Sequence, residues 1–230
     1  MLNKPLLVVL SGAGMSAESG IKTFRDANGL WENHRIEDVA SPEGFRANPD
    51  LVHDFYNQRR AQAVECQPNS GHLGLVDLEN DFEVVVVTQN VDGLHEKAGS
   101  SHVIHLHGEL SKVCCTLSSC NYMEDIGGQP LHSSDRCTNG HPKRPFIVWF
   151  GEQVPKLEEA AQWVRKAEYL VIIGTSLQVY PAAGLLYEAR PEAVIYYIDP
   201  QPAPTPSQVK VIAEGAGKGV GILKEFLGVA

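Results

Sequence analysis

Residues 6–17 read LLVVLSGAGMSA, so that an apolar run gives way to a turn rich in glycine. The run from Leu6 to Leu10 is typical of a strand that is buried on both faces of a parallel sheet. The turn fits the G-x-G-x-x-[GA] pattern, in which glycines let the backbone approach a pyrophosphate at the start of a helix. A tight strand-to-helix turn without a ligand would show the same pattern. We predict a strand at Leu6–Leu10, a cofactor-binding turn at Gly12, Ala13 and Gly14, and a helix that starts near Ser16.

Apolar runs and helical stretches alternate along the rest of the chain. Further strands are predicted at Phe82–Thr88, Val103–Leu106, Phe146–Phe150, Tyr169–Ile173 and Val194–Ile198. Predicted helices cover Asp50–Glu65, Val154–Ala167 and Pro181–Ala189, and residues 209–230 hold a last strand and helix. This alternation predicts an α/β fold with a Rossmann-like, doubly wound parallel sheet.

Polar loops follow several of these strands, at the edge where doubly wound sheets bind ligands. Gln89, Asn90 and Asp92 follow one strand, and Gly174, Thr175 and Ser176 follow another. Asp199 ends a strand where a ribose-binding carboxylate is expected. A hydride-transferring dehydrogenase is disfavoured, because the chain does not return to a strand after the glycine turn. It enters a long polar segment with Phe24 and Arg25, which we interpret as a lid over the cofactor.

The composition narrows the class of partner. The 230 residues carry a formal net charge of -9, and no long run of lysine or arginine is present. Proteins that bind nucleic acids usually present a basic face, so we expect no nucleic-acid partner. No apolar segment approaches the length of a membrane span, and Leu6–Leu10 is too short for the core of a signal peptide. We expect a cytoplasmic monomer without a membrane partner.

Four of the five cysteines lie close together in the sequence: Cys114, Cys115, Cys120 and Cys137. In a reducing cytoplasm, such a cluster suggests a metal site before a disulfide. The surrounding segment, 113–144, is poor in apolar residues and needs a stabilising link other than a core. We interpret it as a small insertion in a larger domain.

Five motifs follow one another along the chain. They are Gly12-Ala13-Gly14-Met15-Ser16 with Ser19-Gly20-Ile21 and Phe24-Arg25, then Thr88-Gln89-Asn90-Val91-Asp92-Gly93-Leu94-His95, Leu106-His107-Gly108, Val148-Trp149-Phe150-Gly151-Glu152 and Gly174-Thr175-Ser176-Leu177. In this order they resemble the sirtuin family, and most of all its compact bacterial members. The resemblance spans almost the whole chain.

The resemblance implies two domains and a reaction. A Rossmann-like domain would comprise residues 1–30, 75–112 and 145–230. A smaller, zinc-ribbon-like domain would comprise a helical insertion at 31–74 and the cysteine segment at 113–144. NAD and an extended acyl-lysine peptide would bind between them. The implied reaction is attack of the acyl oxygen on the nicotinamide ribose, departure of nicotinamide, and hydrolysis of an imidate to lysine and O-acyl-ADP-ribose. The alternatives are an ADP-ribosyltransferase or NAD hydrolase on the same scaffold, and more remotely a non-catalytic binding module.

The resemblance also assigns roles to residues. His107 would accept a proton from a ribose hydroxyl, as suits an imidazole near neutral pKa. It is preferred to His95 and His105 because it directly precedes the glycine of the Leu-His-Gly motif. Asn90 would act with it, and Gln89, Asn90 and Asp92 would orient the ribose and the nicotinamide amide. Phe24 would shield the reacting sugar carbon from water. Further contacts are expected from Arg25 and Ala216 to the cofactor, and from Val148, Phe150 and Gly151 to the substrate.

Tyr56 and Arg59 lie three residues apart on a predicted helix, so they project from one face. An isolated Y-x-x-R is most simply a solvated arginine beside a half-buried tyrosine. In the sirtuin family the pair at this point marks members that remove negatively charged acyl groups. A guanidinium can bind a distal carboxylate through two hydrogen bonds, with a phenol as a further donor. The neighbouring Arg60 is expected to point away from Tyr56.

The cysteine segment departs from the family pattern of two Cys-x-x-Cys pairs. Cys115 and Cys120 can form a first pair with a longer spacing, and Cys137 can start the second. The fourth ligand of a zinc ion would be His141, or less readily His132, whereas Cys114 is not expected to share the ion with Cys115. The other interpretation is a branch of the family that lost its zinc and kept stray cysteines.

Overall fold

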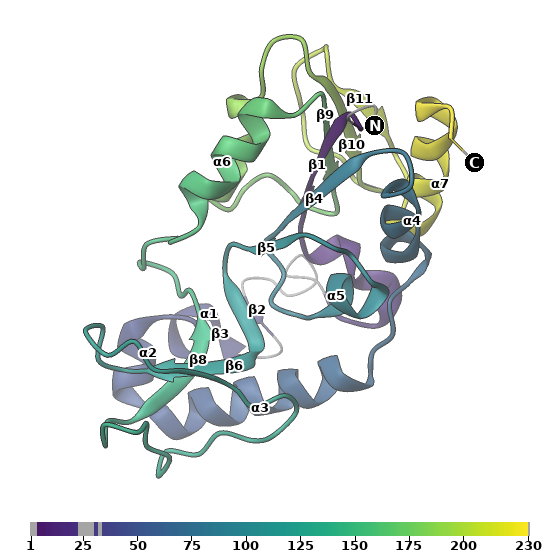
Figure 1. Cartoon of the computed structure of the whole chain (residues 1–230). Helices are drawn as coiled ribbons and strands as arrows, with labels where there is room; N and C mark the ends of the chain where they lie inside the picture. Colours follow the sequence, from purple (N-terminus) through teal and green to yellow (C-terminus); the bar gives the residue numbers. More distant parts are fainter. Residues whose placement is uncertain (1–3, 23–29, 32–33, 230) are drawn as a thin grey trace.

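The computed structural model describes residues 4–22, 30–31 and 34–229. Its main sheet is wholly parallel, with the strand order β11-β10-β9-β1-β4-β5 (Figure 1). These strands are β1 (Leu6–Ser11), β4 (Glu83–Thr88), β5 (Val103–His105), β9 (Tyr169–Ile173), β10 (Val194–Ile198) and β11 (Lys210–Ile212). The predicted doubly wound sheet is confirmed. Its order changes direction at β1, which lies between β4 and β9, so the binding crevice is expected at the carboxyl ends of these three strands.

Helices cover both faces of this sheet. One face packs against α4 (Ser70–Leu78) and α7 (Ala216–Leu227), and the other against α6 (Leu157–Lys166) and the 3₁₀ segment η4 (Ala182–Glu188). Alternate residues of β1 serve the two sides, since Val8 and Leu10 belong to one core and Leu7 and Val9 to the other. The continuous apolar run of β1 is thereby explained.

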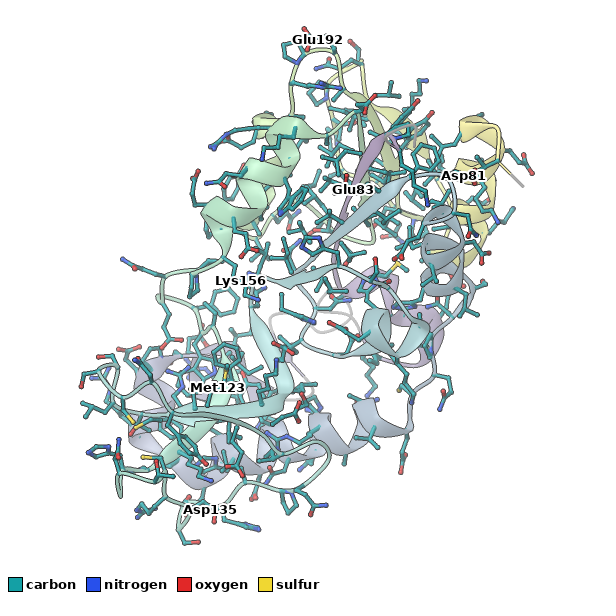
Figure 2. All side chains as sticks on the ribbon, viewed as in Figure 1. Asp81, Glu83, Met123, Asp135, Lys156 and Glu192 are labelled. Atoms are coloured by element: carbon teal, nitrogen blue, oxygen red, sulfur yellow. The ribbon has the colours of Figure 1, made fainter. Side chains whose placement is uncertain are left out.

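A second, smaller part of the molecule lies at the other end (Figure 1). It contains the helices α1 (Ile36–Val39), α2 (Pro42–Ala47) and α3 (Pro49–Glu65), the short pair β2 (Leu30–Trp31) and β3 (His34–Arg35), and an antiparallel sheet in the order β7-β6-β8. That sheet comprises β6 (Gly108–Cys115), β7 (Met123–Asp125) and β8 (Lys143–Ile147). The short helix α5 (Leu94–Ala98) follows β4. Figure 2 shows Met123 and Asp135 at this end, remote from Glu192 at the tip of the parallel sheet.

The helix α3 confirms the prediction for Asp50–Glu65 and shows how its ends are fixed. The Asn48 side chain accepts a hydrogen bond from Leu51 N, and Pro49 occupies the first turn. At the other end, Lys97 Nζ donates to the carbonyls of Val64 and Cys66. Val52 and Phe55 are buried, whereas Val64 is exposed. Most of the apolar face of α3 therefore lies in its first turns, and in the last turn the partly buried Ala63 still packs against the small core.

Two sequence predictions on helices were wrong in type. Instead of an α-helix near Ser16, two 3₁₀ turns occupy Ala13–Met15 and Ala17–Ser19 and end at Gly20, whose φ is 91°. Glycine and serine are poor helix formers, and short i to i+3 turns suit such sequences. The segment predicted as a helix at Pro181–Ala189 is likewise the 3₁₀ segment η4.

One strand was predicted out of position. The strand expected at Phe146–Phe150 is β8, Lys143–Ile147, because polar residues pair with β6 as readily as apolar ones at this edge.

Among the described residues, no helix is long and apolar enough to cross a membrane.

Candidate active site

Two glycine turns meet at the carboxyl ends of β1 and β9. Gly12 N donates to Ile173 O at 3.0 Å, and Gly14 N donates to Gly174 O at 2.8 Å. A Cβ on Gly14 would lie 2.7 Å from Gly174 Cα, and Gly174 itself has a φ of 61°. Both positions therefore require glycine. Ala13 lies between these contacts, half-buried, in the turn predicted to bind a phosphate.

The loop after β4 is tied to the glycine turn through Ser16. Asn90 Nδ2 donates to Ser16 Oγ at 3.1 Å, and Ser16 Oγ donates to Asp92 Oδ2 at 3.0 Å. Leu94 N donates to the other oxygen of Asp92. Burial raises the pKa of Asp92, while the bonds from Leu94 and Ser16 lower it in part. Asn90 and Asp92 are thus oriented by partners, as a pair that positions a ligand requires.

The remaining predicted cofactor residues lie along the same edge of the sheet. Gln89 Nε2 donates to Thr175 Oγ1 at 3.2 Å, and the Tyr197 hydroxyl donates to Thr175 O at 2.7 Å. Asp199 is buried and accepts from Gln201 N. Ser176 is half-buried after Thr175, and Ala216 is buried at the start of α7. Phe24 and Arg25, predicted to form a lid, lie outside the described residues.

His107 is half-buried and directly precedes β6. Its Nδ1 lies 3.1 Å from the carbonyl oxygen of Gln89. A carbonyl can only accept, so Nδ1 carries the hydrogen and Nε2 presents a lone pair. Burial lowers the pKa of His107, although the bond to Gln89 raises it in part. The ring is therefore neutral at pH 7 and able to accept a proton at Nε2.

The two neighbouring histidines are held in other states. His105 lies between two acceptors, Asn90 O at 3.0 Å and Glu96 Oε1 at 2.7 Å. Burial lowers its pKa, but Glu96 and the Asn90 carbonyl raise it more, so that the net shift is upward. His95 is fully buried with Nε2 3.0 Å from Ser11 Oγ, and burial lowers its pKa to about 3. His105, with an acceptor at each ring nitrogen, and the inaccessible His95 are poor general bases, so this geometry favours the prediction of His107.

The segment 148–151 connects His107 with the helix α3. Val148 N donates to His107 O at 2.9 Å, and Trp149 Nε1 donates to the Tyr56 hydroxyl oxygen at 3.0 Å. Phe150 N donates to Ala40 O, its side chain is half exposed, and Gly151 follows with a φ of 89°. The segment that holds the predicted substrate residues Val148, Phe150 and Gly151 therefore contacts His107 on one side and Tyr56 on the other.

Tyr56 and Arg59 differ in burial. Tyr56 is fully buried, and burial raises its pKa, so the phenol stays protonated. Arg59 is half-buried, with its guanidinium carbon 4.8 Å from the centroid of the Phe55 ring. A solvated arginine beside a half-buried tyrosine does not describe this arrangement. Arg60 is buried and makes contacts of its own, through Nε to Leu110 O and Nη1 to Asn57 Oδ1, both at 2.6 Å.

The support of Trp149 was not foreseen from the sequence. The Arg144 guanidinium lies 3.5 Å from the centroid of the Trp149 ring and pairs with Glu152 through two hydrogen bonds of 2.6 and 3.0 Å. Glu152 also accepts from Trp149 N at 2.8 Å. Glu152 belongs to the motif Val148–Glu152 and Ser16 to the motif Gly12–Ser16, so the sequence could have marked both as parts of the site. Nothing in the sequence pattern connects Arg144 with them.

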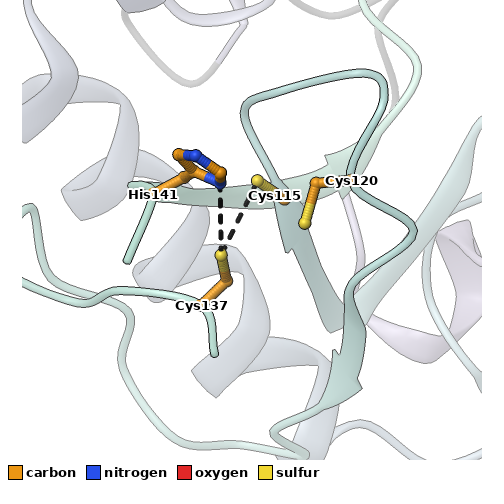
Figure 3. Close-up of side chains that lie close together, drawn as sticks. All are labelled: Cys115, Cys120, Cys137 and His141. Atoms are coloured by element: carbon orange, nitrogen blue, oxygen red, sulfur yellow. Dashed lines mark hydrogen bonds between the residues drawn. The ribbon is translucent and has the colours of Figure 1, made fainter. Parts of the chain in front are cut away.

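The predicted metal ligands come together in space (Figure 3). The donor atoms of Cys115, Cys120, Cys137 and His141 all lie within 4.8 Å of one another. Cys137 Sγ is 3.8 Å from both Cys115 Sγ and His141 Nδ1. Zinc–sulfur bonds of about 2.3 Å in a tetrahedron place two sulfurs about 3.8 Å apart. His132 and Cys114 are not in this cluster.

The charges of the thiols also fit a cation. Burial and the neighbouring thiols raise the pKa of Cys115 to about 11. Burial acts the same way on Cys137, but backbone N–H groups of Asn139 and His141 help to lower its pKa to about 7. Three close thiols cannot all ionise without a positive partner, and Zn²⁺ would supply it. The residues present thus fit a structural zinc ion held by three thiolates and one imidazole.

A family model, curated proteins and solved structures all relate this chain to Sir2 proteins. Residues 12–181 match the Sir2 family. An NAD-dependent protein deacylase from Bacteroides thetaiotaomicron is 53% identical over 227 residues, which cover 96% of this chain and 97% of the relative. A mutant Sir2 homologue solved in complex with ADP-ribose has a TM-score of 0.88 at 36% identity, covering 99% of this chain and 95% of its own. A Sir2 homologue solved in complex with NAD has a TM-score of 0.84 at 38% identity, covering 97% and 91%.

Proposed function

This chain belongs to the Sir2 family, and we propose that, as an NAD-dependent protein deacylase, it removes both acetyl groups and acidic acyl groups such as succinyl and malonyl from lysine side chains. The proposed removal of acidic acyl groups rests on the hydrogen-bonded path from His107 through Val148 and Trp149 to Tyr56. It joins the base to the Tyr-x-x-Arg pair on α3 and gives the acyl group a polar far end.

NAD is proposed to be held by residues at the carboxyl edge of the parallel sheet. The turn at Gly12, Ala13 and Gly14 offers a close backbone approach for the pyrophosphate, and Asp199 a buried carboxylate for a ribose. Asn90 and Asp92, fixed through Ser16, would orient the nicotinamide ribose and amide. NAD supplies the electrophilic sugar carbon and the nicotinamide leaving group.

His107 is the proposed general base. Its Nδ1 hydrogen is fixed on Gln89 O, so Nε2 is the atom that would take a proton from a ribose hydroxyl. The bond to Gln89 stabilises the imidazolium that then forms, as the upward effect of that bond on the pKa of His107 indicates. The acyl-lysine peptide is proposed to bind as an extended strand beside Val148, Phe150 and Gly151.

The acyl end is proposed to be read by Tyr56 and Arg59. A charged hydrogen bond in a partly buried pocket contributes roughly 1.5 to 3 kcal/mol, or about ten- to a hundredfold in specificity. An acetyl group is too short to reach this pair. The fixed position of the Tyr56 oxygen on Trp149 Nε1 supports the role, because a pre-positioned donor loses less entropy on binding.

The test compares one peptide carrying succinyl-lysine with the same peptide carrying acetyl-lysine. Arg59→Met should lower kcat/KM for the succinyl peptide by about tenfold or more, with little effect on the acetyl peptide. Arg59→Lys, which keeps the charge but not the paired N–H groups, should be intermediate. Arg46→Met on the neighbouring helix α2 is the matched control, since Arg46 is exposed.

Parallel loss on both peptides would remove Arg59 from acyl recognition. The same assay decides between deacylation and the alternatives on this scaffold. A deacylase releases nicotinamide only when an acyl-lysine peptide is present. Release without peptide would favour an NAD hydrolase, and labelling of the peptide with ADP-ribose would favour a transferase.

A further inference from the structure

We propose that Asn57 is a specificity-determining positioning residue, whose side-chain amide sets the location of Arg59 by fixing α3 to the segment that leads into the metal cluster. The inference rests on the proposed function, because it concerns the recognition of acidic acyl groups. Asn57 directly follows Tyr56, and no motif in the sequence marked it.

The contacts of Asn57 form a clamp. Its Nδ2 donates to Leu131 O at 2.9 Å, and its Oδ1 accepts from Leu131 N at 2.8 Å, so one amide satisfies both backbone groups of Leu131. The same Oδ1 accepts from Arg60 Nη1 at 2.6 Å, and Arg60 Nε donates to Leu110 O on β6 at 2.6 Å. The helix α3 is thereby joined to two segments that lie 50 and 74 residues further along the chain. Leu131 and Arg60 are both buried, where hydrogen bonds are costly to break.

The clamp lies where the apolar packing of α3 becomes sparse. Val52, Phe55 and Tyr56 are buried in the small core, but beyond Asn57 only Ala63 packs against it, and the helix borders a cavity of about 300 Å³. Arg60, Ala63 and Val64 line this cavity on the α3 side. Since a cavity provides no partner atoms, van der Waals contacts constrain this half of the helix weakly. Its position therefore depends largely on hydrogen bonds, those of Asn57 and Arg60 in the middle of the helix and those of Lys97 at its end.

Arg59 belongs to this half of the helix. Its guanidinium stacks on Phe55, a residue of the same helix, so it moves when α3 moves. Tyr56 is tied in addition to Trp149 on the opposite side. A charged hydrogen bond of about 2.8 Å is largely lost once its atoms separate by a further ångström. Loosening the clamp should therefore weaken binding of a distal carboxylate and leave an acetyl group, which does not reach Arg59, almost unaffected.

The experiment measures kcat and KM separately for the succinyl and acetyl peptides with the full-length enzyme and saturating NAD. Asn57→Ala removes the three hydrogen bonds of Asn57 and leaves that from Arg60 to Leu110. It should raise KM for the succinyl peptide by about tenfold, with kcat and the acetyl parameters changed by less than about threefold. Asn57→Asp keeps an oxygen for Leu131 N and Arg60 but cannot donate to Leu131 O, so it should be intermediate. Gln58→Ala, an exposed amide one residue away, should behave like the unmodified enzyme.

A double variant tests whether Asn57 acts through Arg59. If it does, adding Asn57→Ala to Arg59→Met causes no further loss on the succinyl peptide. Equal losses on both peptides, or additive losses in the double variant, would overturn the proposal and leave Asn57 a structural residue. If Asn57→Ala does not fold, the KM ratio of Asn57→Asp decides alone. Selectivity lost with Arg59→Met but kept with the Asn57 variants refutes only the clamp, whereas selectivity unaffected by Arg59→Met refutes the proposed function itself.

Discussion

The buried side chain of His72 should lower the free energy of unfolding of the protein in mild acid. The side chain is fully buried at the start of α4, where Nδ1 accepts from Asn69 N in a capping box. Its ring lies against that of His95, with the centroids 4.9 Å apart. Burial lowers the pKa of His72 from 6.5 to about 4. The ring is therefore neutral in the folded protein at any pH above that value.

The direction of the effect follows from the difference between the pKa of His72 in the folded chain and its pKa in the unfolded chain. As the pH falls below 6.5, the unfolded chain takes up a proton on His72, and the folded chain does not until about pH 4. The free energy of unfolding therefore falls across this window by about 1.4 kcal/mol for each pH unit, or about 3 kcal/mol in all. Below pH 4 the contribution of His72 levels off.

His72→Gln isolates this contribution. Glutamine can form the same capping-box bond and has no charge to gain. Urea unfolding at intervals from pH 7.5 to 4 should show the variant less stable at neutral pH, with a deficit that shrinks by about 3 kcal/mol toward pH 4. His132→Gln is the control, because that side chain already meets solvent in the fold. A deficit that stays constant with pH would show that His72 is protonated alike in both states and would refute the reasoning.

Two further outcomes concern the base and the metal. His107→Ala should lower deacylation by about a hundredfold or more with NAD affinity retained, measured by peptide turnover and by calorimetric titration with NAD; near-normal turnover would rule out His107 as the base. Protein purified without added metal should contain about one zinc per chain by elemental analysis, retained in His141→Cys and lost in Cys137→Ser, with a lower Tm after chelation; a folded, active, metal-free preparation would contradict this.

The arrangement of the sheet could be predicted because each central strand is buried on both faces. Runs such as Leu6–Leu10 and Tyr169–Ile173 have no polar face, so they fit only a parallel sheet covered by helices, as the two cores of the structure show. The glycine turns and polar loops then had to lie at one edge. The types of the short helices were less predictable, because Ala13–Met15 and Ala17–Ser19 are held by contacts with Gly174 and Asn69 rather than by their own propensity.

The different contacts of Arg59 and Arg60 could not be predicted from the sequence. Both follow Tyr56 on one helix, and helical spacing alone allows either as its companion, because residues three and four apart share a face. Arg60 is held by Leu110 O, which is remote in sequence, and by the Asn57 amide on the same helix, which is itself held by the remote Leu131. Periodicity within α3 carries no information about these partners. For the same reason the sequence left His141 and His132 open as ligands until the fold placed His141 beside Cys137.

The loop after β4 uses its main chain and its side chains for different tasks. The carbonyls of Gln89 and Asn90 accept hydrogen bonds from His107 and His105, and so fix a hydrogen on one nitrogen of each ring. The side chains of the same two residues turn the other way, to Thr175 and Ser16 in the glycine turns. A movement of this loop would therefore reach both histidines through backbone carbonyls, which substitution of the Gln89 or Asn90 side chain leaves in place. The backbone thus fixes the tautomer of His107, and the proposed base depends on the same loop that would hold the nicotinamide ribose.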